Sequence, residues 1–163
     1  MKTDVKDLER EILSSSQRCI GPLATIVAML LVLGFFAAHQ SANTGFFTDK
    51  FGSSEMLALY GPILVSFAAP IVRTISGRQN PARPFDAATN LSLAVGSLWL
   101  ATVFPFNFAH LTDVLPSAIR FIFSWINNDI GRFVLILQVI LGVIVAPLTM
   151  LTYFSVRRRA STT

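Results

Sequence analysis

The feature that most constrains this chain is an apolar stretch at residues 133–154, which reads FVLILQVILGVIVAPLTMLTYF. Its 22 residues include no charged side chain, and Arg157, Arg158 and Arg159 follow shortly after it. As a helix rising about 1.5 Å per residue, the stretch covers roughly 33 Å, whereas the hydrocarbon core of a bilayer is roughly 30 Å thick. It therefore predicts a transmembrane helix whose arginine-bearing end lies in the cytoplasm.

The composition agrees with a chain embedded in a bilayer. Of the 163 residues, 53% are hydrophobic and only 13% are charged, whereas soluble domains carry about 25% charged residues. The single cysteine, Cys19, excludes an internal disulfide and a multi-cysteine metal site. The net charge of +4 would suggest nucleic acid for a soluble protein, but here the basic residues flank apolar stretches. We therefore expect a lipid bilayer as the partner and no nucleic acid.

Three further apolar stretches complete the expected fold, an all-α, polytopic membrane protein with four transmembrane helices in one bundle over residues 19–155. The four spans are expected at about 19–38, 55–72, 87–108 and 133–154. The first is interpreted as an uncleaved helix, because its apolar part exceeds the usual 7–15 residues of a signal peptide. Pro105 is expected to kink the outer end of the third span, and Trp99 to pack between helices near mid-span.

The segments between and around the spans are expected to be short. Residues 1–18 are interpreted as a cytoplasmic amphipathic helix, either a solvated lead-in or a surface that contacts membrane or partner. Residues 73–86 are expected to form an irregular loop, since Gly77, Pro81 and Pro84 disfavour regular structure. Residues 116–127 predict a short exterior helix lying in the membrane interface, and Asn128 or Asp129 is expected to cap the last helix. Residues 156–163 form a basic cytoplasmic tail.

The distribution of basic residues predicts the orientation. Ten of the 13 Lys and Arg residues lie in the N-terminal segment, the 73–86 loop and the C-terminal tail, and three lie in the other two connections. Cytoplasmic segments carry the excess of Lys and Arg, so both termini are expected in the cytoplasm of a plasma-membrane protein.

The sequence offers little that could carry catalysis. It contains no nucleotide-binding loop, zinc-ligand pair or nucleophile elbow. No Asp, Glu, Lys, Arg or His lies at mid-depth in the four spans, where proton relays and ion-coupled transporters keep such residues. This argues against an enzyme, a cofactor and a pump, but it leaves a passive pore open.

Small and weakly polar residues recur at helical spacing in the third and fourth spans. Such stripes allow helices to approach closely and to hydrogen-bond across the contact. They predict the interior of the bundle, with a pore lining or a docking face for another subunit as the alternatives. Asn90 and Gln138 are expected to bond across helices. The predicted packing residues are Asn90, Ala94, Ser97, Ala101, Gln138, Gly142, Ala146 and Thr149.

Two histidines are the remaining candidates for a site. His39 and His110 end the first and third spans at the same expected side, and Asp113 lies one turn beyond His110. This arrangement could bind a metal or haem, but two imidazoles fall short of the usual three or four ligands. The simpler interpretation is two rings at the membrane rim, in a protein without metal or cofactor. It predicts that replacing either histidine by alanine changes stability by under about 1 kcal/mol.

These observations favour a non-enzymatic membrane component that packs against itself, as a homo-oligomer, or against other membrane subunits. The alternative is an oligomeric channel or transporter subunit for a small solute. A membrane enzyme or cofactor carrier is the third possibility.

Overall fold

The computed structural model describes residues 11–161, and it confirms the all-α prediction. The chain is 77% helical and has no strand among the described residues. Its α-helices are α2 (Ser15–Ser41), α3 (Ser53–Val65), α4 (Ala68–Ser76), α5 (Arg83–Val103), α6 (Ser117–Phe123) and α7 (Asn128–Ala160), and two 3₁₀ turns occupy Asn80–Ala82 and Phe108–His110.

Three helical segments are long and apolar enough to cross a membrane, which supports the interpretation as a membrane protein. They are α2, the consecutive pair α3–α4 over Ser53–Ser76, and α7, with 27, 24 and 33 residues. The 21-residue α5 is not among them, because polar residues such as Asn90 and Ser97 interrupt its apolar sequence.

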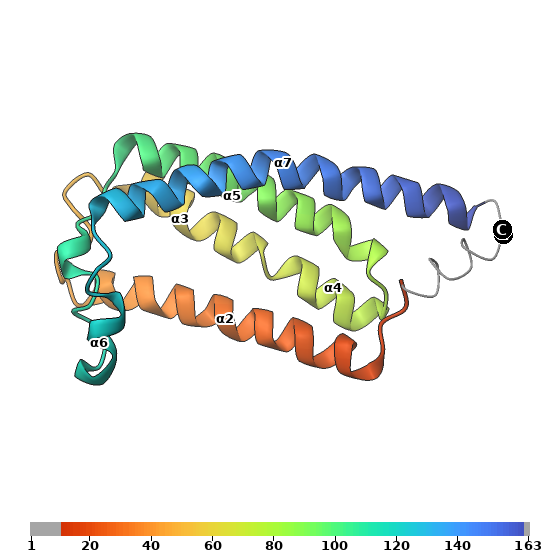
Figure 1. The fold of residues 1–163 in the computed structure, drawn as a ribbon, viewed down its shortest axis with the longest axis horizontal. Coiled ribbons are helices and arrows are strands. Elements are labelled where there is room, and N and C mark those ends of the chain that lie inside the picture. Colours follow the sequence, from red (N-terminus) through yellow and green to blue (C-terminus); the bar gives the residue numbers. More distant parts are fainter. Residues whose placement is uncertain (1–10, 162–163) are drawn as a thin grey trace.

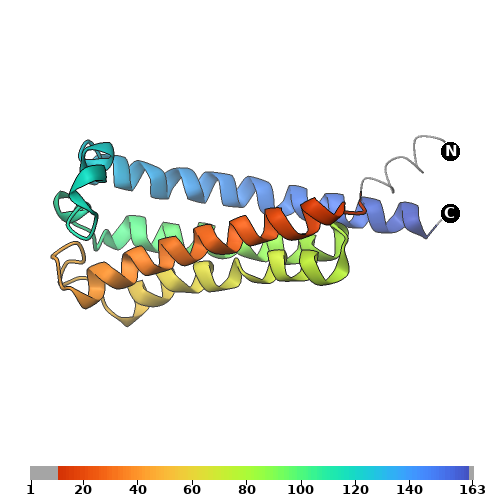
Figure 2. The ribbon, with the colours of Figure 1, turned by 90° about the horizontal axis from the view of Figure 1, so that it is seen from below.

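The long helices lie side by side, and α5 is central to their packing. It packs along α7 on one side and α3 on the other, while α2 packs mainly on α4. Figure 1 shows α3 and α4 between α2 and the α5–α7 pair, and Figure 2 shows α2 nearest the viewer, with α7 and α3–α4 to either side. The apolar stretches of α2 and α7 are only 6% and 11% buried. The two helices therefore present most of their apolar surface outward.

The second expected span consists of two helices with a break between them. α3 ends at Val65 and α4 begins at Ala68. Pro70 has no N–H to donate to the carbonyl four residues earlier, that of Ser66, so the helical hydrogen-bond ladder is interrupted there. The Ser66 hydroxyl donates to the Ile63 carbonyl at 2.6 Å within the break.

The third expected helix, 87–108, is shorter at its end than predicted. α5 stops at Val103, and Phe104 adopts the left-handed conformation with φ of 44°. The following Pro105 disfavours a helical conformation at residue 104. Trp99 consequently lies one turn from the helix end and donates from Nε1 to Glu55 Oε1 at 2.9 Å. The expectation of a mid-span tryptophan was wrong, because it assumed a longer helix.

Residues 73–86 are more ordered than the expected loop. α4 continues to Ser76, where Gly77 with φ of 64° ends it. Pro81 lies in a 3₁₀ turn and Pro84 in the first turn of α5, where a missing N–H costs little. The error came from treating each proline as a breaker when both stand at helix starts.

The remaining boundaries also differ from expectation. Asn127 caps α7 by accepting from the Ile130 N–H at 3.0 Å, so neither Asn128 nor Asp129 is the cap. α7 continues to Ala160, through most of the expected tail, and α6 is shorter than 116–127. Of the segment 1–18, residues 1–10 lie outside the described residues. Residues 11–14 are not helical: Leu13 donates to the Gly77 carbonyl at 3.0 Å, and α2 begins after Ser14.

Candidate functional site

The tightest helix contact joins the predicted stripes of α5 and α7. Gly142 faces the Asn90 carbonyl oxygen, and a Cβ added to Gly142 would lie 2.8 Å from Ala94 Cβ. Ala94 and Ala146 are buried, 3% and 7% exposed. The absence of a side chain at Gly142 is what lets the two backbones approach so closely.

One hydrogen bond crosses the same contact. The hydroxyl of Ser97, which is buried, donates to Gln138 Oε1 at 2.8 Å. Asn90 instead donates to the Asp86 carbonyl at 2.8 Å within its own helix, and the Thr149 hydroxyl donates to Val145. Gln138 therefore bonds across helices as expected, whereas the bond of Asn90 goes to Asp86 in its own helix. Ala101 is half-buried near the end of α5.

A second close contact involves Gly96, which is not among the predicted packing residues. Gly96 of α5 lies against the Ala58 carbonyl oxygen, and a Cβ on Gly96 would also come within 3.1 Å of the Pro62 ring. Gly96 lies beside the predicted stripe, on the side that faces α3. Its role depends on which helix lies there, which spacing within α5 does not reveal.

The end of the bundle that carries α6, here named the aromatic end, is closed by packed phenylalanines. Phe46 is 1% exposed and Phe106 is 6% exposed. The Phe47–Phe106 bridge joins the two connecting segments, and Arg132 lies over the Phe104 ring at 4.5 Å. The rings in this cluster are those of Phe35, Phe36, Phe46, Phe47, Phe104, Phe106 and Phe108.

His39 is buried within this cluster, at 1% exposure. Its Nε2 lies 3.1 Å from the Leu111 carbonyl oxygen, and its Nδ1 lies 2.6 Å from Thr44 Oγ1. A carbonyl only accepts, so Nε2 carries the proton, and Nδ1 of the neutral ring accepts from the Thr44 hydroxyl. Both ring nitrogens have protein partners, and the ring joins α2 to the segment after α5.

His110 lies close to this position but is more exposed. Its Nδ1 pairs with Asp113 Oδ2 at 2.9 Å, and both side chains are over 40% exposed. The carboxylate thus orients the imidazole as the spacing suggested. Within residues 11–161, no group of three or more His, Cys, Asp or Glu side chains is placed to hold a metal ion.

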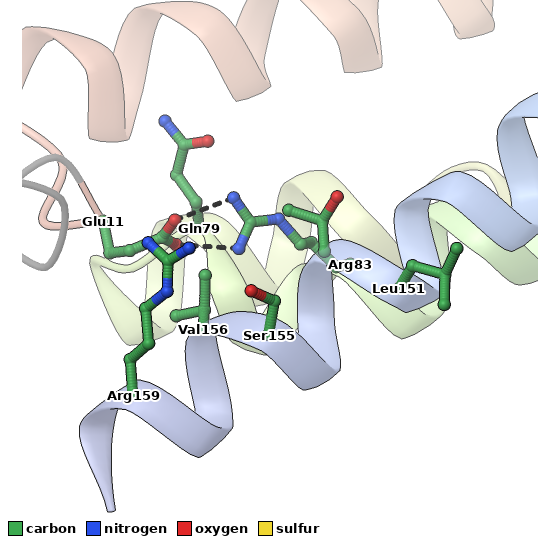
Figure 3. Close-up of a pocket in the computed structure, with 8 residues that line it drawn as sticks. Glu11, Gln79, Arg83, Leu151, Ser155, Val156 and Arg159 are labelled. Carbon is green, nitrogen blue, oxygen red and sulfur yellow. Dashed lines mark hydrogen bonds and ion pairs between the residues drawn. The ribbon is translucent and has the colours of Figure 1, made fainter. Parts of the chain in front are cut away.

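The opposite end, here named the arginine end, contains residues 11–18, the α4–α5 connection and the last turns of α7. A cleft, here named the arginine-end cleft, runs between α7 and that connection. Its outer part has a volume of about 580 Å³ and its inner part about 410 Å³, and Gln79, Arg83 and Thr152 line both. Figure 3 shows the outer part, with Glu11 and Arg83 on one side and the α7 side chains on the other.

Two ion pairs line the arginine-end cleft. Arg83 donates to both carboxylate oxygens of Glu11, at 2.8 and 3.1 Å, and to Asn80 Oδ1 at 2.7 Å. Arg73 pairs with Asp86 at 2.5 Å, just before the third expected span. Both pairs join residues of separate segments and so tie this end of the bundle together.

Sequence reasoning did not find this cleft. Glu11 and Arg83 are 72 positions apart, and neither stands in a recognisable motif. The only available signal was the abundance of arginine in the three segments that meet there. Comparisons with protein-family models, curated proteins and solved structures found no match for this chain.

Proposed function

We propose that this chain is an integral membrane protein with four spans and both termini in the cytoplasm. The fourth span, in addition to the three apolar segments, is α5, whose 21 residues cover about 31 Å. Its polar Ser97 is buried against α7, where it bonds Gln138, and Asn90 is half-buried; such sheltered polar residues are compatible with a span of lower apolarity. Figure 1 places both ends of the described chain at the arginine end, as an even number of spans requires.

In this arrangement α6 lies in the exterior membrane interface. Phe121 is 72% exposed and Trp125, just after the helix, is 66% exposed. Exposed aromatic rings suit the headgroup region, where an apolar body and a polar edge are both accommodated. Figure 1 shows α6 at the aromatic end, below the end of α2.

The proposed function is that of a non-enzymatic component that associates with itself or with other membrane subunits through α2. The observation that carries this proposal is the unfilled small-residue face of α2. Gly142 and Gly96 each contact another helix, whereas nothing lies within 4 Å of a Cβ built on Gly21. Ala24 and Ala28, on the same face of α2, are exposed. Such a face permits close approach of another transmembrane helix.

The test compares assembly in mild detergent. Ala28→Leu fills the small face of α2 and is expected to lower the oligomeric or co-purifying fraction in size-exclusion chromatography with light scattering. Leu30→Phe is the control, because it adds the same number of heavy atoms at an exposed position on the opposite face of α2. A wild-type chain that is monomeric and carries no partner protein contradicts the proposal.

The alternative, a channel or transporter subunit for a small solute, is favoured by one observation. The inner part of the arginine-end cleft brings the polar side chains of Asp86, Asn90, Thr149 and Thr152 together beside the apolar Val145 and Leu148, so polar groups continue along α7. Flux of small solutes into liposomes containing the purified protein tests it, and flux that depends on the protein would favour this alternative.

A further inference from the structure

We propose that the arginine-end cleft binds the phosphate headgroup of an anionic phospholipid from the leaflet at that end. The inference rests on the proposed placement of the bundle in a membrane, and it adds a ligand to that proposal. Basic pockets between transmembrane helices at the cytoplasmic side are the usual sites for such headgroups.

The charge of this end favours an anion. The described residues of the arginine end include two acids, Glu11 and Asp86, and seven arginines, which are Arg18, Arg73, Arg78, Arg83, Arg157, Arg158 and Arg159. Anionic lipids attract each nearby basic residue with about 1 kcal/mol. The excess of arginines attracts anionic headgroups to this end in general, and the cleft offers one defined position where a headgroup can bind.

The α7 wall of the cleft offers both apolar and polar groups. Its apolar side chains are Val145, Leu148, Leu151 and Val156, its hydroxyl groups are those of Thr149, Thr152 and Ser155, and Arg159 lines the outer part. Val145 and Arg159 are 14 positions apart, or about 21 Å along the helix. An acyl chain suits Val145 and Leu148 at the inner end, and a glycerol and phosphate suit the hydroxyl groups and the Arg159 guanidinium.

The wall opposite α7 holds a second cation, Arg83, paired with the Glu11 carboxylate, which would compete with a phosphate. Figure 3 shows the Arg159 side chain extending from α7 toward the Glu11–Arg83 pair, and all three line the outer cleft. Guanidinium groups bind phosphate in the same two-pronged geometry that Arg83 now uses for the Glu11 carboxylate. A headgroup in the cleft therefore competes with Glu11 for Arg83, and it competes with the present interaction of Arg159 for the guanidinium on α7.

The experiment measures binding of lipid to the purified full chain in detergent by native mass spectrometry and by the shift in Tm. The probes are phosphatidylglycerol, phosphatidylcholine with the same acyl chains, and inorganic phosphate at matched concentration. Phosphatidylglycerol is expected to bind most tightly and to raise Tm most. Arg159→Gln is expected to weaken its binding about 10-fold, which equals the loss of one charge-assisted contact of roughly 1.4 kcal/mol.

Two further variants separate the cleft from general electrostatics. Arg78→Gln removes the same charge at the same end from a residue that does not line the cleft, and it is expected to change binding by less than 2-fold. Glu11→Gln removes the competing carboxylate and is expected to strengthen binding, a gain that damage to the fold does not produce.

Three results would overturn the inference. Equal binding of phosphatidylcholine shows no preference for an anion, and equal losses in Arg159→Gln and Arg78→Gln show diffuse attraction without a site. If inorganic phosphate binds as tightly as phosphatidylglycerol and raises Tm as much, the cleft binds the free ion and the lipid is not its ligand. Assembly state is recorded on the same samples, so failure of lipid binding with assembly intact leaves the proposed function standing.

Discussion

At the scale of single residues, His39 shows how one buried side chain joins segments that are far apart in the sequence. Its imidazole accepts from Thr44 and donates to Leu111, and it packs against Phe35 and Phe46 with ring centroids 4.7 and 4.6 Å away. A neutral ring satisfies both hydrogen bonds at once. His39 therefore has the contacts of a residue that closes the aromatic end of the bundle.

The two histidines are expected to differ in their contribution to stability. His39→Ala removes two hydrogen bonds and leaves a cavity among aromatic rings, so it is expected to lower the free energy of unfolding by roughly 2–4 kcal/mol. His110→Ala removes a partly exposed pair and is expected to cost under about 1 kcal/mol. Unfolding in mixed micelles measures both values. Equal losses of stability in the two variants would contradict this prediction. From the sequence alone, a small effect was expected for both histidines.

The Ser97–Gln138 hydrogen bond is the second residue-scale test. Ser97→Ala is expected to destabilise the bundle by about 0.6–1.7 kcal/mol, the range for hydrogen bonds between transmembrane helices. Ser92→Ala serves as the control, because the Ser92 hydroxyl donates to Thr89 within its own helix and its loss is expected to cost less. If Ser92→Ala lowers stability as much as Ser97→Ala, the interhelical hydrogen bond stabilises the bundle no more than a bond within one helix.

At the scale of elements, the sequence predicted which segments are helical and missed where several of them end. Apolar length identifies α2 and α7 because a bilayer-spanning helix needs about 20 apolar residues. Apolar length alone does not take proline into account. The third span therefore ended early before Pro105, where only a kink was expected, and the second span is broken before Pro70. The stripe containing Gly142 was visible because a helix face has a fixed spacing. The contact of Gly96 with α3 and the cleft beside Arg83 depend on which helices become neighbours, which spacing within one helix does not encode.

The α5–α7 contact leads to a prediction for a pair of helices. Gly142→Leu forces a side chain into the space occupied by the Asn90 carbonyl and Ala94, and overpacking of this kind costs typically 1–3 kcal/mol or more. Gly34→Leu is the matched control, because nothing lies within 4 Å of a Cβ at Gly34. Thermal unfolding in detergent is expected to show a clear loss for Gly142→Leu and little change for Gly34→Leu. The same Tm for both variants would mean that the close contact does not limit packing.

At the scale of the whole molecule, the two ends of the bundle differ in chemistry. The arginine end has its net positive charge and its cleft, and the aromatic end is closed by packed phenylalanine rings around His39. Positively charged ends are retained in the cytoplasm during insertion. This asymmetry supports the proposed direction of the bundle, and the proposed lipid binding in the cleft depends on that direction.

The orientation can be tested with single cysteines in a Cys19→Ser background, since Cys19 is the only native cysteine. Ser161→Cys places a thiol after α7 at the arginine end, and Ser117→Cys places one at the start of α6 at the opposite end; both positions are exposed. A membrane-impermeant maleimide added to intact cells is expected to label the Ser117→Cys variant, and the Ser161→Cys variant only after permeabilisation. Labelling of both variants in intact cells would place residues 117 and 161 on the same side of the membrane and contradict a single crossing by α7. The reverse pattern would invert the bundle and place the arginine-end cleft outside, away from the anionic leaflet that its charge is expected to contact.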